Sequence, residues 1–128
     1  MIELDYAFLA DYARVEGGKL TAVGASYTHT KTPGLPAAHL VCVAGRIRVS
    51  EDVHTVDLGA RFSAPRDMVV MDISGTLDAD GGIPYEGRKG VLFAFQMQVG
   101  LPVPGLYTVD LSLDGKHVRT LKFDVSVL

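Results

Sequence analysis

"PGLYTVDLSLDG", residues 104–115, alternates apolar and polar residues and then reaches an Asp-Gly turn. In an extended strand, side chains point to opposite faces with a period of two. One face of this stretch therefore carries Tyr107, Val109, Leu111 and Leu113. Such a pattern indicates a strand with one buried and one solvated face. We expect residues 104–113 to form one wall of a β-sheet core.

The Asp114-Gly115 turn predicts a hairpin that joins this strand to residues 119–128. A two-residue loop would place Leu121 and Phe123 opposite the polar face of the first strand, and side-chain alternation makes such a register costly. A three-residue loop, in which Gly115 forms a bulge, keeps the apolar residues together. The sequence therefore predicts a three-residue loop with Gly115 at positive φ.

The same alternation recurs along the whole chain, and no window shows clear helical spacing. Turn-forming residues separate the alternating segments. We therefore predict an all-β fold, a two-sheet antiparallel sandwich of immunoglobulin-like or jelly-roll-like type with about eight strands, in a single domain over residues 1–128. The remaining segments that carry the pattern are 2–13, 19–30, 39–50, 54–64, 67–82, 90–100 and 119–128.

Composition narrows the function classes. The chain has 128 residues, 48% of them hydrophobic, and a formal net charge of −3. Because the charge is slightly acidic, we expect no nucleic-acid partner. The single cysteine, the lack of a long apolar run and an acidic amino terminus predict a cytoplasmic protein with no membrane contact.

No motif for catalysis or metal binding is present. The "DADGG" stretch, residues 78–82, resembles the start of a calcium loop, but Lys89 stands where that loop requires glutamate. The four histidines form no close pair, and no G-x-S-x-G motif occurs. We therefore expect no catalytic residue, no cofactor and no metal.

Residues 24–36 are one candidate binding surface. This long segment carries Tyr27, His29 and Lys31, and long loops in compact domains often have a function. An ordinary crossover between two sheets is the alternative interpretation.

A second candidate surface involves Leu40, Cys42 and Leu92. Residues 40–44 are apolar on both faces of their strand, and Leu92 lies in another such strand. If these faces adjoin, they form an apolar patch suited to a homo-oligomer or to an unknown protein partner. A loop folded over the patch is the alternative, and both interpretations stay open.

Two stretches of the chain, the second of which begins with the strand described first, carry a family resemblance. They are "LADYARVEGGKLTAVGASYT", residues 9–28, and "PGLYTVDLSLDGKHVRTLKFDVSV", residues 104–127. With their ADYA…GKL opening and PG-x-Y…DG closing hairpin, they resemble a family of small uncharacterised bacterial proteins, often actinobacterial, that is classed as a domain of unknown function. The resemblance implies a bacterial source and supports the fold, and it implies no activity.

These observations favour a non-enzymatic binding or interaction module. A β-sandwich that binds a small ligand or carbohydrate through Tyr27 is the first alternative, although the chain has no tryptophan to offer as a sugar platform. An enzyme whose site is assembled from distant strands is the second, and it requires a polar pocket with perturbed titratable groups.

Overall fold

The computed structural model describes all 128 residues, Met1–Leu128, and contains eleven β-strands and one short 3₁₀ helix. The all-β class is confirmed, whereas the count of about eight strands is wrong. Four of the strands have only three to five residues, and such short segments show too few alternating positions to be recognised in a sequence. The elements are β1 (Ile2–Ala10), β2 (Tyr12–Glu16), β3 (Lys19–Val23), β4 (His29–Thr32), β5 (Ala37–Ser50), β6 (Thr55–Ser63), η1 (Pro65–Asp67), β7 (Val70–Asp78), β8 (Ile83–Tyr85), β9 (Arg88–Leu101), β10 (Gly105–Leu113) and β11 (Lys116–Val127).

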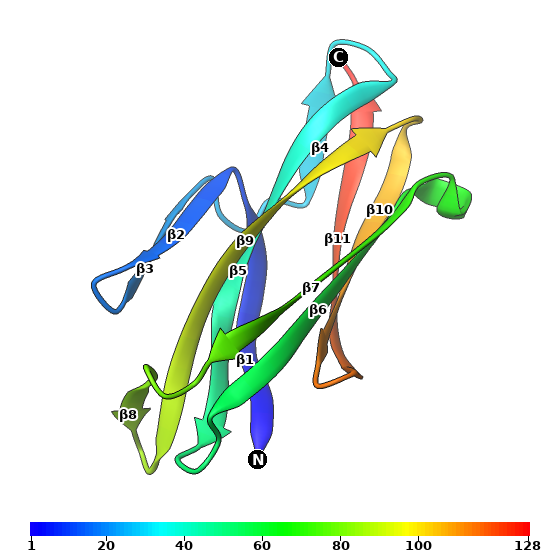
Figure 1. The fold of residues 1–128 in the computed structure, drawn as a ribbon. Helices are drawn as coiled ribbons and strands as arrows, with labels where there is room; N and C mark the ends of the chain where they lie inside the picture. Colours follow the sequence, from blue (N-terminus) through cyan, green and yellow to red (C-terminus); the bar gives the residue numbers. More distant parts are fainter.

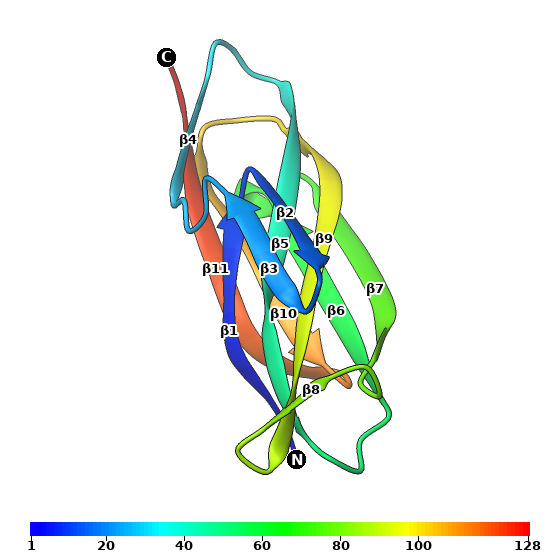
Figure 2. The ribbon, with the colours of Figure 1, turned by 90° about the vertical axis from the view of Figure 1, so that its left-hand side faces the viewer.

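Two sheets form the body of the molecule (Figure 1). One has the strand order β1-β5-β9-β8 and is antiparallel throughout. The other has the order β4-β11-β10-β6-β7, in which only the pairing of β4 with β11 is parallel. The strands β2 and β3 form a separate hairpin, which lies over the outer face of the first sheet (Figure 2).

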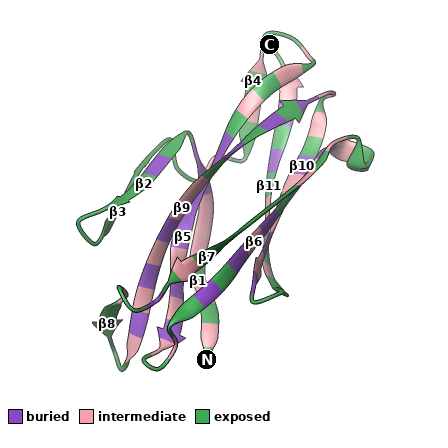
Figure 3. Ribbon diagram, viewed as in Figure 1, coloured by how far each residue is buried: buried purple, intermediate pink, exposed green.

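The core lies between the two sheets and consists of one cluster of 22 buried residues drawn from both. Buried positions alternate with intermediate or exposed ones along most of β6, β9 and β10, as a period of two requires (Figure 3). Tyr107, Val109, Leu111 and Leu113 of β10 are all buried, which confirms the wall predicted for this strand. Burial of each such side chain contributes about 1.5–3 kcal/mol.

The turn between β10 and β11 differs from the prediction. Leu113 pairs with Lys116, so the loop has only two residues, Asp114 and Gly115. Their φ angles are 48° and 81°, which is the left-handed pair of a type I′ turn. The three-residue loop is therefore wrong, and the positive φ of Gly115 is confirmed. A carboxylate oxygen of Asp114 accepts a 2.8 Å hydrogen bond from the backbone N–H of Asp57, which holds the turn against β6.

A β-bulge restores the register further along the hairpin. The register shifts between Leu111 and Ser112, and beyond this point Tyr107 pairs with Phe123. The apolar faces of β10 and β11 thus meet as predicted, although the extra residue lies inside the ladder and not in the loop.

Tyr107 closes the corner between β9 and β10. Its hydroxyl donates a 2.6 Å hydrogen bond to the carbonyl of Val103 and accepts one of 3.3 Å from the N–H of the same residue. Its ring packs between Phe62 and Phe123, at centroid distances of 5.7 and 5.5 Å. Burial raises the pKa of the Tyr107 phenol, so the neutral, hydrogen-bonding form is retained.

Candidate functional site

The segment that carries Tyr27, His29 and Lys31 presents these side chains in two different directions. Tyr27 is half-buried and packs on Phe123, with ring centroids 5.9 Å apart. His29 and Lys31 belong to β4 and are exposed, and His29 Nε2 lies 2.9 Å from the hydroxyl of Ser126. The three residues therefore do not share one surface, and the ring of Tyr27 is no exposed platform.

Tyr27 instead forms a pair with His39 of β5. The Tyr27 hydroxyl lies 3.2 Å from His39 Nε2, and both rings contact Phe123. Burial, aided by the charge of Asp11, raises the pKa of Tyr27 to about 12. Burial also lowers the pKa of His39, although Asp11 opposes this effect. Both groups are thus held neutral, and the pair joins residues 24–36 to the core.

This pair predicts that stability depends on pH. Because the pKa of His39 is lowered by folding, the unfolded chain binds a proton more readily than the native one. The contribution of His39 to the free energy of unfolding is therefore fully present above pH 6.5, the ordinary pKa of histidine. This contribution is lost as the pH falls from 6.5 through the lower pKa that His39 has in the folded protein. Urea unfolding at mildly acidic and neutral pH should therefore show a smaller free energy of unfolding in acid.

The His39→Gln variant should lose this part of the pH dependence. His29→Gln, at an exposed position, is the control and should keep it. If wild-type protein and His39→Gln respond identically to pH, His39 is not the group responsible.

The second candidate surface is divided by the β2–β3 hairpin. Cys42 is buried in a small cluster with Ala10, Ala13 and Ala44, where the hairpin covers the outer face of β5. These small residues allow the hairpin to approach the sheet closely. Of the two interpretations that the sequence left open, a covering segment is what the structure places over Cys42.

Leu40 lies outside this cover, whereas Leu92 lies beside the tip of the hairpin, where Val15 and Gly18 line a pocket together with it. Leu40 is exposed and pairs with Gln98, whereas Leu92 is half-buried and pairs with Arg46. Gln98, the partner of Leu40, lies six positions along β9 from Leu92, which corresponds to about 20 Å. Leu40 and Leu92 do not form one patch, and self-association through them stays a prediction.

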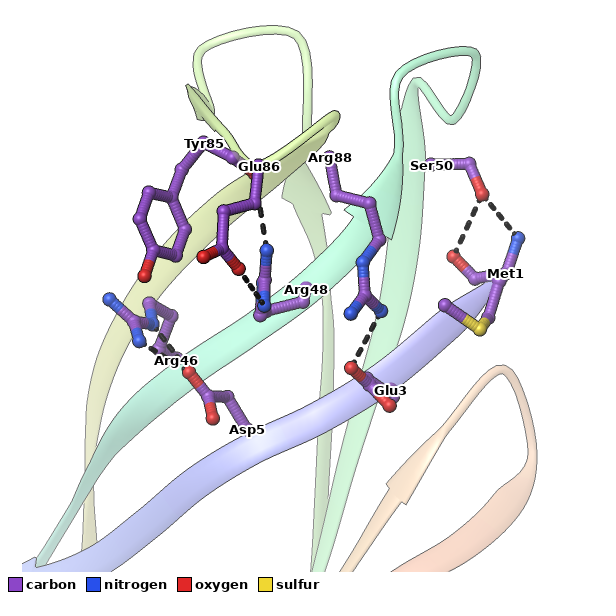
Figure 4. A network of polar contacts seen from close by, with 9 residues as sticks. All are labelled: Met1, Glu3, Asp5, Arg46, Arg48, Ser50, Tyr85, Glu86 and Arg88. Carbon is purple, nitrogen blue, oxygen red and sulfur yellow. Dashed lines mark hydrogen bonds and ion pairs between the residues drawn. The ribbon is translucent and has the colours of Figure 1, made fainter.

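A network of ion pairs covers the end of the first sheet (Figure 4). Arg46 donates to Asp5 at 2.8 Å, and Arg88 donates to Glu3 at 2.6 Å. Arg48 lies over the ring of Tyr85 at 4.9 Å and donates a 3.1 Å hydrogen bond to its carbonyl.

Each arginine of the network also has a carboxylate within 4 Å, so the network joins β1, β5 and the β8–β9 hairpin. No group of three or more His, Cys, Asp or Glu is placed to hold a metal ion.

The feature that sequence reasoning missed is the free edge of β9. One edge of β9 pairs with β5 along its whole length, but on the other edge only residues 88–90 pair, with β8. Residues 91–101 therefore present an unpaired edge, and none of these eleven residues is charged. The edge of β7 that faces away from β6 is unpaired as well.

An apolar groove lies between these two edges. A cavity of about 150 Å³ is lined by Phe93 and Phe95 of β9, by Ile73 and Leu77 of β7, and by neighbouring residues, none of which is charged. Ile73 is 37% exposed although it faces this groove. The missed signal is the charge-free run of residues 91–101 beside a strand of only three residues.

The opposite side of the molecule is different. There β11 has an unpaired edge below its contact with β4, and it carries the exposed cations Lys116, Arg119 and Lys122. None of these three takes part in an ion pair. Charged side chains on an edge strand discourage pairing with another chain. The edge of β9 lacks this protection.

The fold and the groove together define an all-β domain of two facing sheets with one open, apolar edge. The chain belongs to the family of unknown function DUF6941, whose sequence profile matches residues 5–126. The resemblance to a domain of unknown function is thereby confirmed. No curated protein matches the sequence.

Among solved structures, the chain is similar to the alkylpurine DNA glycosylase AlkC of Pseudomonas fluorescens bound to DNA containing an abasic site analog. The TM-score is 0.54 and the identity 5%, and the match covers 97% of this chain and 30% of that chain. The similarity at this identity concerns the fold. No helix of the structure has the length and apolar character needed to cross a membrane.

This comparison contradicts the prediction that nucleic acid is not a partner, because a part of similar fold occurs in a DNA-bound protein. The prediction used the net charge of −3, which is a sum over the whole molecule. Neither this sum nor its division between the two halves of the sequence shows where the fold places cations, and the structure has Lys116, Arg119 and Lys122 without ion-pair partners along one strand.

Proposed function

We propose that the protein is a binding module that accepts an extended segment of a partner protein as an additional strand beside β9. The observation that carries the proposal is the free, charge-free edge of residues 91–101 above an apolar groove. Main-chain hydrogen bonds to such an edge supply affinity, and a groove for alternate side chains supplies specificity. A cytoplasmic location belongs to this proposal and is supported by the single free Cys42.

We also assign the sandwich to the immunoglobulin-like type. In support, β1-β5-β9-β8 follows the order A-B-E-D, and β11-β10-β6-β7 follows the order G-F-C-C′. Tyr107 at the start of the F strand bonds to the backbone four residues upstream, as a tyrosine corner does. In this assignment β8 is a D strand of only three residues, and the free row beside β9 is where a full D strand would run.

The backbone groups of β9 that face this row follow from the β8–β9 turn. Glu86 and Gly87 have φ of 50° and 76°, so they form a two-residue type I′ turn, and its flanking residues Tyr85 and Arg88 make a hydrogen-bonded pair. The backbone N–H and C=O groups of successive residues in a strand point toward opposite neighbouring strands. Those of Arg88 point toward β8, so those of residues 92, 94, 96 and 98 point toward the free row on the same side.

Gln96→Pro tests the proposal because it removes one of these N–H groups. Proline is tolerated on an edge strand where its missing donor faces solvent, so the fold should persist. Peptides selected from a phage-displayed library of random nonapeptides against the wild-type protein should bind Gln96→Pro about tenfold more weakly or worse. Gln96→Ala, which keeps the N–H, should bind them like the wild type. Fluorescence polarisation with synthetic peptides measures both.

Circular dichroism of Gln96→Pro verifies that it is folded. Failure to select any peptide, or equal affinity of wild type and Gln96→Pro, would contradict the proposal. A labelled duplex DNA oligonucleotide is the second probe because the similar solved structure is DNA-bound. Saturable DNA binding that Gln96→Pro leaves unchanged, with no peptide binding, would point to nucleic-acid binding instead.

A further inference from the structure

We propose, on the basis of the function above, that the strand beside β9 comes from a disordered segment of another protein and runs antiparallel to β9, with uncharged aliphatic side chains at the positions that face the groove. Three features of the site lead to this partner: the direction of β8, the chemistry of the groove, and the burial of the chain's own strands.

The direction follows from β8. This strand already occupies the first part of the row beside β9 and pairs with it in the antiparallel sense, through residues 83–85 and 88–90. A strand in the same row and direction continues the existing ladder, and antiparallel pairing is slightly more stable per residue than parallel pairing. The free row from Val91 to Leu101 is about 33 Å long, and its occupant has to leave the sheet where it meets Ile83.

The groove sets the chemistry of the inward-facing side chains. Its walls are Phe93 and Phe95 on one side and Ile73 and Leu77 on the other. None of the residues that line it is charged, so none could neutralise a charged side chain of the partner. A charged side chain placed there would lose its hydration without compensation. A cavity of about 150 Å³ suits one compact apolar group, such as a leucine, isoleucine or valine side chain.

The free edges of β9 and β11 in a second copy of this chain do not provide such side chains. The inward-facing residues of β9 are at most 6% exposed at Val91, Phe93, Met97 and Val99, so they are already used in their own core. The free edge of β11 carries Lys116, Arg119 and Lys122. A segment that is disordered before binding keeps its apolar side chains available, and its ordering on binding is typical of such partners.

Matched peptides test the chemistry. A selected peptide is compared with two variants that carry aspartate, one at the central groove-facing position and one at the adjacent outward-facing position. We expect the first variant to bind about tenfold more weakly or worse and the second to keep most of its affinity. Equal losses in both variants would overturn the assignment of the groove side.

The direction is tested with a nitroxide label at either end of the peptide and amide NMR spectra of the protein. A label at the peptide's amino end should broaden the amides of Gly100 and Leu101, and a label at its carboxyl end should broaden that of Leu92. The reverse pattern means a parallel strand and overturns the inference. If Gln96→Pro still abolishes binding in that case, the proposed function stands and only the partner's direction is wrong; if Gln96→Pro binds normally, the proposed function itself fails.

Discussion

Gly45→Ala is expected to destabilise the protein by on the order of 3 kcal/mol or more. Gly45 lies in the middle of β5, between Ala7 of β1 and Phe93 of β9. A Cβ atom added there would clash with the carbonyl oxygen of Tyr6 and would lie 2.9 Å from the Cα of Ala7. These are backbone atoms of a paired strand, so relief requires β1 to move away from β5.

The measurement is the free energy of unfolding in urea, with Gly100→Ala in the neighbouring strand as the control. Gly100 also lies in a long strand, β9, but a Cβ atom added there meets nothing within 4 Å. Gly100→Ala should therefore leave the stability unchanged or slightly raised. If the two variants unfold alike, the close approach of β1 to β5 is not as described.

Tyr107→Ala should cost about 3–5 kcal/mol, because it removes a ring that is fully buried between Phe62 and Phe123. Tyr107→Phe keeps the ring and removes only the hydroxyl, which leaves the carbonyl and N–H of Val103 without their partner. This variant should lose about 1–3 kcal/mol. Folded domains of this size have about 5–15 kcal/mol of stability, so the alanine variant loses a large part of it.

Urea unfolding of both Tyr107 variants separates the ring from the hydroxyl. Tyr107→Phe with wild-type stability would show that the corner between β9 and β10 does not depend on the hydroxyl. The contribution then rests on packing alone, and the tyrosine-corner part of the immunoglobulin-like assignment loses its support.

The strands and the wall that β10 contributes were predictable because a period of two is a local property of the sequence. Tyr107 and Val109 could be placed on the core face from their neighbours alone. The register of the β10–β11 hairpin was not fully predictable. Asp-Gly is a local signal for a two-residue type I′ turn, but no local pattern places the bulge between Leu111 and Ser112 that brings the apolar faces back together.

The candidate site was not predictable for a similar reason. Tyr27 was recognised as notable, yet its direction depends on His39 and Phe123, which reach it only through the tertiary fold. Cys42 was recognised as apolar on a second face, and the β2–β3 hairpin that covers it is a long-range packing feature. The edge of β9 is free because no strand pairs with residues 91–101 on that side. The alternation pattern of a single strand does not show which strands lie next to it in a sheet.

Amide hydrogen exchange tests most directly whether a partner strand pairs with the free edge of β9. Exchange is measured by NMR with and without a saturating selected peptide. Binding should slow exchange at residues 92, 94, 96 and 98, whose N–H groups face the free row, and it should change residues 93 and 95 much less because β5 already pairs with them. Unchanged exchange at residues 92–98 together with protection on another face of the molecule would contradict the account.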